Sequence, residues 1–534
     1  MEPHIELIVF GLLVAVSGLA VVARLVSIPY PILLVLGGLA FGFVPGVPDL
    51  QLEPDLVLLL FLPPLLYAAA FFANLRELRA NARPIGMLAI GLVIATMLTV
   101  AGVAHEVVGL SWPVAFVLGA VVSPTDAVAP AEILRRLSVP RRVVSVVEGE
   151  NLTNDWTALV AYKFAVAAVV TGSFSLLEAG PEFVYTGLAG VAVGVAAGAG
   201  IAAVRRRVED PITEITISLL TAYAAYLPAE QIGASGVLAA VSAGVWLGWR
   251  ASELTNHTTR LQLTAIWQLL VFLLNAVLFV LVGLQLPTVL DQLSGRTAGE
   301  LAGYGALIAV VVIVVRIAWV YALTYLIRQL SSRVRERGPV ANWDQTALVA
   351  WSGMRGSVSL AAALAIPTSI DSGGAFPDRD LVIFLAFCVI LATLVIQGLL
   401  MPALIRAMHI KPDTLDQDEE LNARLEIAYA AIDQIDDLEQ EDWVHPQTVE
   451  RTRMMFDYRR RRFASRVGNG SPVDEEQDDF DYEGRAETYQ RFMHEVIGAQ
   501  RTALRRLRDE GDVSDEVRRR VEYDLDLEEA RLSN

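Results

Sequence analysis

The segment 148–156 reads Glu-Gly-Glu-Asn-Leu-Thr-Asn-Asp-Trp and lies inside a long apolar run. A charged side chain at the centre of a bilayer costs about 2.5–3.5 kcal/mol on insertion scales, so acids kept at that depth indicate a function. Glu150 and Asn154 are four residues apart and share a helical face. Asn151 and Asp155 form a second pair of this kind. These four side chains predict one wall of oxygen ligands, which another helix must complete.

The chain around this segment has the composition of a membrane protein. Of its 534 residues, 54% are hydrophobic, and the mean hydropathy is +0.48. Residues 1–411 form a succession of apolar runs, each long enough to cross a bilayer core of about 30 Å. The pattern predicts an all-α polytopic fold of about thirteen transmembrane helices. Their expected starts are near residues 5, 29, 54, 83, 112, 143, 182, 211, 231, 261, 300, 344 and 379.

Positive charge in the connecting loops predicts the orientation of these helices. Arginine is abundant after odd-numbered helices, as in 76–83, 135–142 and 205–207, and scarce after even-numbered ones. Cytoplasmic loops carry the excess of Lys and Arg, which places the N-terminus outside and the C-terminal tail in the cytoplasm. The first four residues lack the basic region of a signal peptide, so residues 5–26 are interpreted as a retained span. We expect a multi-pass protein of the plasma membrane, the inner membrane of a bacterium.

Residues 412–534 form a charged tail that holds most of the chain's net charge of −17. Helical periodicity in this tail predicts a helical cytoplasmic appendage. No Walker-type glycine loop, Gly-x-Ser-x-Gly motif or zinc motif occurs in the chain, and Cys388 is its single cysteine. We therefore expect a protein that is not an enzyme, needs no cofactor and binds no nucleic acid.

The apolar run before the opening segment contains another acid, Asp126, within the sequence Ser123-Pro-Thr-Asp. Pro124 removes a backbone donor and Pro130 does so again six residues later, which predicts unwound backbone between them. Such backbone is tolerated at bilayer depth only where protein or a water-filled cavity satisfies it, and its exposed carbonyls suit an ion site. Asp126 and its neighbour Thr125 are therefore predicted to supply the second wall.

A second interruption is predicted at Gly353-Met-Arg-Gly356, where two glycines flank a buried cation. Arg355 keeps its proton and needs a counter-charge, for which Glu150 is the candidate. The fifth and twelfth helices hold matching places in two groups, helices 4–6 and 11–13, of opposite orientation. This arrangement is the one that an inverted repeat requires. We predict two broken helices that cross at the midplane of the membrane.

Two further cations lie within predicted helices. Lys163 follows Asp155 by eight residues and is expected to reach the end of its helix, where its ammonium group snorkels toward water. Arg316 lies in the middle of the eleventh helix and is expected to be a structural ion-pair partner. Neither is assigned to the ion site.

In these motifs the chain resembles the monovalent cation/proton antiporters of the electroneutral branch, which comprise the bacterial NhaP-like sodium/proton antiporters and the animal sodium/proton exchangers. The resemblance covers about residues 5–408. It rests jointly on four segments, 123–126, 148–155, 272–283 and 353–356. Together these motifs are highly specific.

The resemblance assigns the family's site to positions Asn154, Asp155, Thr125, Asp126, Glu150 and Arg355. They match, in that order, its Asn-Asp pair, its Thr-Asp pair and its Glu–Arg ion pair. The chain departs from the family at Asn151, where serine is common. An amide oxygen also coordinates a cation, so Asn151 is kept among the expected ligands.

The resemblance also implies a homodimer of thirteen-helix protomers. Each protomer would have a core domain, at about 83–172 and 300–408, that moves against a dimerisation domain, at about 5–73 and 211–287. Residues 412–534 would remain a separate cytoplasmic tail.

The mechanism expected from these residues is competition between two ions for Asp155. A monovalent cation would be held at Asp155, Asp126 and Thr125, and a proton would replace it on Asp155. Arg355 would compensate charge at the helix breaks. Because asparagine rather than aspartate precedes Asp155, only one carboxylate of the pair exchanges a proton for a cation. This predicts 1:1 electroneutral exchange. We expect Na+ as the substrate, with Li+ as a further one.

Other functions fit parts of the same pattern. A K+/H+ antiporter would use the same site, because a linear sequence does not report the radius of a cavity. A cation channel shares the ligands but needs no titrating carboxylate. A proton-coupled carrier for an organic solute would want an aromatic-lined cavity, and no aromatic cluster flanks Asp126 or Asp155. An intramembrane hydrolase is disfavoured by the absence of histidine from the clear spans.

Overall fold

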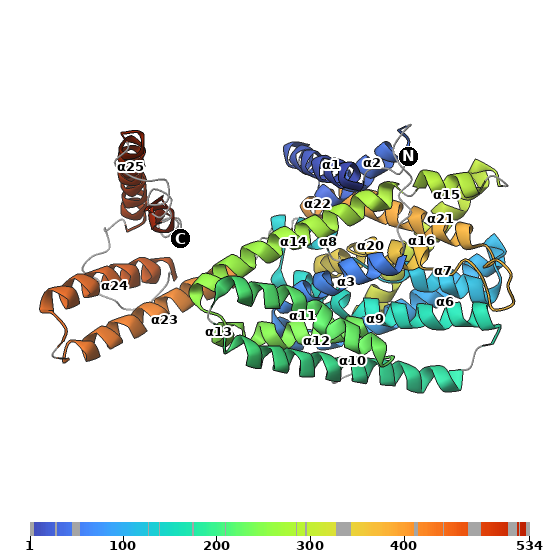
Figure 1. Cartoon of the computed structure of the whole chain (residues 1–534), viewed down its shortest axis with the longest axis horizontal. Helices are drawn as coiled ribbons and strands as arrows, with labels where there is room; N and C mark the ends of the chain where they lie inside the picture. Colours follow the sequence, from blue (N-terminus) through green and yellow to red (C-terminus); the bar gives the residue numbers. More distant parts are fainter. Residues whose placement is uncertain are drawn as a thin grey trace. The chain divides into compact units, whose positions relative to one another are not determined.

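The protein is described here by a computed structural model, which is shown in Figure 1. It describes residues 5–26, 29–44, 54–126, 128–137, 139–173, 176–208, 210–284, 286–293, 296–326, 343–408, 410, 415–441, 443–467, 482–510, 521–522 and 524–529. The chain divides into two compact units, residues 1–412 and 413–534. Within the described ranges all long elements are helical, and strand pairing is limited to one isolated bridge between Ser369 and Ala375.

The first unit begins with a series of helices that leads to the opening motif. They are α1 (Ile5–Val26), α2 (Tyr30–Gly42), α3 (Pro54–Phe71), α4 (Leu75–Ala80), α5 (Ala82–Gly86), the π-helical turn η1 (Met87–Leu92), α6 (Val93–Val103), the π-helical turn η2 (Ala104–Val108), α7 (Trp112–Val122), α8 (Val128–Arg136) and α9 (Arg141–Thr171).

The same unit continues through a second series. These helices are α10 (Leu176–Arg205), α11 (Pro211–Gln231), α12 (Gly236–Trp249), α13 (Ala251–Leu254), α14 (His257–Leu284), α15 (Leu286–Gln292), α16 (Ala298–Tyr321), η3 (Ala322–Leu326), α19 (Trp343–Trp351), α20 (Ser357–Leu364), α21 (Arg379–Ala392), η4 (Thr393–Gln397) and α22 (Gly398–Ala407).

Several of these helices have the length and composition of membrane spans. Among the described residues, five stretches are long and apolar enough to cross a bilayer: Ala82–Val108, Gly180–Arg205, Thr258–Leu281, Ala298–Tyr325 and Arg379–Ala407. Shorter apolar helices include α2, α7 and α12. The all-helical membrane fold is confirmed, and the count of thirteen spans stays a prediction.

Two interruptions of the helical backbone position the site. Helix α7 ends at Val122 and α8 begins at Val128, and α19 ends at Trp351 before α20 begins at Ser357. Pro124 lies in the first gap and cannot donate a backbone hydrogen bond. Unwound backbone was expected as far as Pro130, but α8 begins at Val128 and Pro130 lies in its first turn. The backbone N–H groups of a first turn have no partner within the helix, so proline is tolerated there.

Helix α9 contacts elements that lie well before it and well after it in the sequence. It packs against α7, α8, α12 and α19, so residues far apart in sequence surround its polar segment. Small residues let helices approach closely elsewhere: a Cβ at Gly244 or Gly248 of α12 would overlap the backbone of Tyr67 or Phe71 on α3. Helices α3 and α12 are therefore in close backbone contact.

The second unit contains α23 (Leu415–Leu438), α24 (Pro446–Val467) and α25 (Tyr482–Asp509). Helices α23 and α24 pack against each other, with Arg453 paired to Asp436 and Glu439. These side chains are exposed, and such pairs contribute roughly 0–1 kcal/mol each, so the tail helices are held together chiefly by their packing.

Candidate ion-binding site

Helix α9 carries the polar residues of the opening motif into the interior of the first unit. Glu150, Asn154 and Asp155 are all at most 2% exposed, and Asn151 is partly buried. A buried charge is costly unless it is paired or hydrogen-bonded, so the partners of each group decide what it can do.

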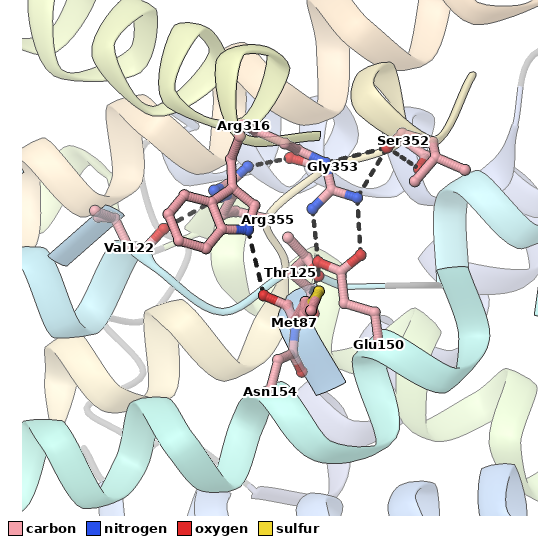
Figure 2. Close-up of polar contacts among 11 residues, drawn as sticks. Met87, Val122, Thr125, Glu150, Asn154, Arg316, Ser352, Gly353 and Arg355 are labelled. Carbon is pink, nitrogen blue, oxygen red and sulfur yellow. Dashed lines mark hydrogen bonds and ion pairs between the residues drawn. The ribbon is translucent and has the colours of Figure 1, made fainter. Parts of the chain in front are cut away.

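Glu150 is neutralised by Arg316 of α16. The guanidinium donates from Nη1 to Oε1 at 2.6 Å and from Nη2 to Oε2 at 2.9 Å, and both side chains are buried. Arg316 also donates to the carbonyl of Val349, and a Cβ at Gly353 would overlap its side chain. This bidentate pair, drawn in Figure 2, confirms the expectation that Arg316 is an ion-pair partner.

The predicted ion pair between Glu150 and Arg355 is therefore wrong. Arg355 is fully buried, and it donates instead to backbone carbonyls, from Nε to Val122 at 3.1 Å and from Nη1 to Gly353. Its own backbone N–H donates to the hydroxyl of Thr393 at 3.0 Å. Because Val122 is the last residue of α7, the cation lies at the negative end of that helix dipole. Of the two buried arginines, Arg316 is the one that forms the ion pair with Glu150.

Thr125 connects the first interruption to α9. Its hydroxyl donates to Glu150 Oε1 at 3.0 Å and accepts from Asn154 Nδ2 at 2.7 Å. The same amide donates to the carbonyl of Thr125 at 3.2 Å. Thr125, Glu150 and Asn154 are labelled in Figure 2. The Asn154 side chain thus holds the unwound segment against the helix, and the structure brings together three of the predicted site residues.

Asp126 connects the two interruptions. Its backbone N–H donates to the carbonyl of Met354 at 2.8 Å, and its carboxylate Oδ1 accepts from the backbone N–H of Val128 at 2.8 Å. The second contact places the carboxylate at the first turn of α8, where the helix dipole favours negative charge. A Cβ at Gly356 would overlap this carboxylate, so glycine makes room for Asp126.

Three carbonyl or carboxylate oxygens in the polar segment of α9 have no hydrogen-bond partner among the described residues. Asp155 Oδ1, Asn154 Oδ1 and Asn151 Oδ1 are buried, and none accepts a hydrogen bond from any described residue. An unsatisfied buried acceptor costs about 1–3 kcal/mol, so these oxygens favour a ligand that supplies positive charge. A hard cation bound through oxygen, or a proton on the carboxylate, meets that need.

Lys163 lies outside this cluster, toward the C-terminal end of α9. Its ammonium pairs with Glu230 Oε2 of α11 at 3.2 Å, and its side chain is largely exposed. The other oxygen of Glu230 accepts from the backbone N–H of Gly236 at the start of α12. The contact ties α9 to the α11–α12 connection and takes no part in the polar cluster around Thr125.

Sequence reasoning missed the contacts that the backbone supplies. The carbonyls of Val122, Val349 and Met354 accept three of the bonds that hold the site together. Every residue has such a carbonyl, so no side-chain pattern marks the ones that are used. The need of Arg316 for an ion-pair partner could be predicted from the sequence, because a charge in the middle of an apolar helix must be paired.

Comparison with known proteins gives the same assignment as these residues. The chain matches the family described as sodium/hydrogen exchanger, transmembrane, over residues 11–407. It is 36% identical to an uncharacterized Na+/H+ exchanger of Mycobacterium tuberculosis, over 98% of this chain and 97% of the relative. It is 35% identical to a sodium, potassium, lithium and rubidium/H+ antiporter of Bacillus subtilis, over 75% of this chain and 61% of the relative.

A solved structure shares the fold. The sodium/proton antiporter MjNhaP1 of Methanocaldococcus jannaschii superposes with a TM-score of 0.60 at 20% identity, over 77% of this chain and 100% of that one. The family predicted from the motifs is confirmed by the match over residues 11–407. The chain belongs to the sodium/hydrogen exchanger family of membrane transporters, the monovalent cation/proton antiporters.

Proposed function

We propose that the protein exchanges a monovalent cation for a proton across the plasma membrane and that Asp155 carries either ion. The observation behind this proposal is that Asp155 Oδ1 is buried without a partner among the described residues, whereas the neighbouring acid Glu150 is neutralised by Arg316. A buried carboxylate that lacks a fixed counter-ion is stable when it holds a proton or a cation. The two ligands therefore compete for one group.

The charges around Asp155 support 1:1 electroneutral exchange. Glu150 and Arg316 cancel, and Asp126 lies at the positive end of α8 while Arg355 lies at the negative end of α7. Asp155 is then the one carboxylate of this group that exchanges a proton for a cation. Asp155 with one proton and Asp155 with one Na+ have the same net charge, so a complete cycle moves no net charge.

The cation is proposed to bind at Asp155, Asp126 and Thr125, with oxygen from Asn151. In this scheme Asn154 is a positioning residue, because its amide nitrogen fixes the unwound segment through Thr125. Its own carbonyl oxygen remains available to the ion or to its water. Arg355 compensates the charge of the first interruption from the α7 side.

Alternating access is the transport mechanism that fits this architecture. We take α7–α8 and α19–α20 as two broken helices that cross at the membrane midplane, and the bond between Asp126 and Met354 supports their movement as one body. The moving core is proposed to span about 83–172 and 300–408. A dimerisation domain at about 5–73 and 211–287 would stay fixed in a homodimer, with the N-terminus outside and the tail in the cytoplasm.

Na+ is the proposed substrate, and K+ is the competing one. The name of the Bacillus subtilis relative includes sodium, potassium, lithium and rubidium, whereas that of the Mycobacterium tuberculosis relative includes sodium alone. Asn151 has a longer side chain than the serine that is common at this position in the family, and we expect it to affect which cation binds.

The test is cation-induced dissipation of a pH gradient in proteoliposomes, with Na+, Li+ and K+ measured in parallel. Wild-type protein should exchange, Asp155→Asn should not, and the matched variant Asp371→Asn, on an exposed loop, should behave as wild type. Folding is checked by size-exclusion chromatography. Exchange retained by Asp155→Asn would sink the assignment, and the order of the cations decides between Na+ and K+.

Electroneutrality has its own measurement. The exchange rate should stay constant when the membrane potential is set to different values with valinomycin and K+ gradients in Na+-driven assays. Solid-supported membrane recordings should show no sustained current. A rate that follows the potential would contradict 1:1 exchange, and a current without proton movement would favour the cation channel.

A further inference from the structure

A cavity of about 460 Å³ lies away from the ion-binding site, where the C-terminal end of α3 meets α4 and α12. This volume is within the range of about 300–1,000 Å³ that is usual for small-molecule sites. The lining residues are Ala70, Ala73, Asn74, Leu75, Arg76, Leu78, Arg79, Val245, Gly248 and Trp249. The loop that contains α4 belongs to the arginine-rich set, which places the cavity at the cytoplasmic membrane surface.

The charge of the lining excludes the transported cation as its occupant. Arg76 and Arg79 are the charged residues of the lining, which contains no carboxylate. Glu77 of the same short helix forms an ion pair with Arg141 at 3.5 Å and also contacts Asn81. Two guanidinium groups repel Na+ and attract anions. Arginine presents a fork of donors that matches the geometry of phosphate, so the chemistry points to a phosphate group.

Trp249 gives the cavity the character of a membrane interface. The Arg79 guanidinium lies 5.6 Å from the centre of its ring and that of Arg250 lies 4.9 Å from it. The Nη1 atom of Arg250 is buried and has no hydrogen-bond partner among the described residues. Trp249 is 59% exposed. Tryptophan and arginine together are typical of the headgroup level of a bilayer.

The walls of the cavity match the rest of a phospholipid. Small and branched apolar side chains also line the cavity, among them Ala70 of α3, Ala73 of the connection to α4 and Val245 of α12. Close backbone packing at Gly248 holds α3 and α12 together, so this wall is preformed. A ligand with a phosphate at one end and glycerol or acyl carbon at the other would meet the arginines and the apolar wall at once.

We propose that this cavity binds the phosphate of an anionic phospholipid headgroup through Arg76 and Arg79. The proposal rests on the proposed function only in taking the chain as a membrane protein with α4 on the cytoplasmic side. Because α4 also packs against α9, a bound headgroup would connect the α3–α12 pair to the helix that carries Asp155. Free phosphate shares the chemistry, and the test separates the two sources.

The test is native mass spectrometry of the full-length, delipidated protein titrated with phosphatidylglycerol or phosphatidylcholine. Wild type should bind phosphatidylglycerol more tightly than phosphatidylcholine. The double variant Arg76→Gln/Arg79→Gln should lose about tenfold in apparent affinity, because two charge-assisted contacts are removed. The matched double variant Arg206→Gln/Arg207→Gln, in the exposed turn after α10, should bind as wild type.

Inorganic phosphate, added alone, separates a lipid from a soluble ligand. If millimolar phosphate displaces phosphatidylglycerol from wild type, and Arg76→Gln/Arg79→Gln abolishes phosphate binding, the phosphate site stands and its source is soluble. Equal binding of both lipids, or lipid binding that is the same in the two double variants, overturns the proposal. Arg76→Lys/Arg79→Lys should bind at an intermediate level, which guards against a glutamine variant that fails to fold.

Binding and transport can fail separately. Asp155→Asn should keep lipid binding while losing exchange, because Asp155 is not part of the cavity lining. If wild type shows no exchange but retains selective lipid binding that depends on Arg76 and Arg79, the lipid site stands and the transport proposal falls.

Discussion

The backbone N–H of Asp126 donates to the carbonyl of Met354 at 2.8 Å, which joins the segment between α7 and α8 to the segment between α19 and α20. Each gap removes backbone groups from helical pairing, and an unsatisfied group within a bilayer costs several kcal/mol. The hydrogen bond therefore satisfies one backbone donor of the first segment and one backbone acceptor of the second. The arrangement keeps Asp126, a predicted ion ligand, at a fixed place relative to Arg355, although 229 positions separate these residues in the chain.

Removing Arg316 should destabilise the protein more than removing most side chains. We expect Arg316→Met to lower the free energy of unfolding by about 3–5 kcal/mol, because Glu150 would remain as a buried, unpaired charge. The double variant Glu150→Gln/Arg316→Met should recover most of that loss. Thermal unfolding of the detergent-solubilised protein measures both.

A comparison of double variants checks which arginine is energetically coupled to Glu150. Glu150→Gln should rescue Arg316→Met but not Arg355→Met, because Arg355 donates to the carbonyls of Val122 and Gly353. Rescue of Arg355→Met alone would show that the Glu150–Arg355 pair is the one that stabilises the protein.

Thr125 should affect exchange through its hydroxyl. Thr125→Val keeps the volume but removes the donor to Glu150 and one acceptor of Asn154. We expect kcat/KM for cation exchange to fall about tenfold or more, which corresponds to about 1.4 kcal/mol of transition-state stabilisation. Thr125→Ser, which keeps the hydroxyl, is the control and should stay close to wild type. Equal activity of the two variants would show that the hydroxyl plays no part.

Gly356 should be intolerant of even one methyl group. Gly356→Ala would place a Cβ on the Asp126 carboxylate, so we expect a large loss of exchange without loss of membrane insertion. The matched substitution Gly299→Ala, in the first turn of α16, meets open space and should exchange normally. Proteoliposome assays with both variants at equal protein density make the comparison. Normal exchange by Gly356→Ala would mean that the position of Asp126 is not critical.

Asp210 should make the stability of α11 depend on pH. Hydrogen bonds from the Thr213 hydroxyl at 2.7 Å and from the Thr213 backbone at 2.8 Å lower the pKa of Asp210 from its ordinary value. A pKa that is lower in the folded state gives stabilisation above the unfolded pKa of about 3.9, which is lost as the pH falls through the folded pKa.

We therefore expect Asp210→Ala to lower the Tm at pH 7 and to have little effect at strongly acidic pH. Asp210→Asn keeps a side-chain oxygen for the helix cap and should lower the Tm less. The measurement is thermal unfolding of the three proteins over a pH series. A Tm difference between wild type and Asp210→Ala that does not change with pH would rule out a role for the charge.

Much of the fold could be predicted from the sequence, because lipid imposes a simple requirement. Apolar runs long enough to cross the membrane form helices, and acidic residues within such runs indicate a functional site because burying them in lipid is costly. Pro124 and the glycines at 353 and 356 predicted two breaks in helical backbone; α7 ends at Val122 and α19 ends at Trp351, while breaks within single helices stay a prediction. Pro130 was misjudged, since its effect depends on whether it begins a helix or interrupts one.

The sequence by itself determined which groups need partners: the acids Glu150 and Asp155 and two arginines, all within apolar runs. The tertiary structure decided the pairing. Arg316 reaches Glu150, Arg355 caps α7, and Asp155 Oδ1 is left without a protein partner. The reason is that attraction between charges depends on distance, and the distance between two helices follows from packing along their whole length rather than from the local motifs.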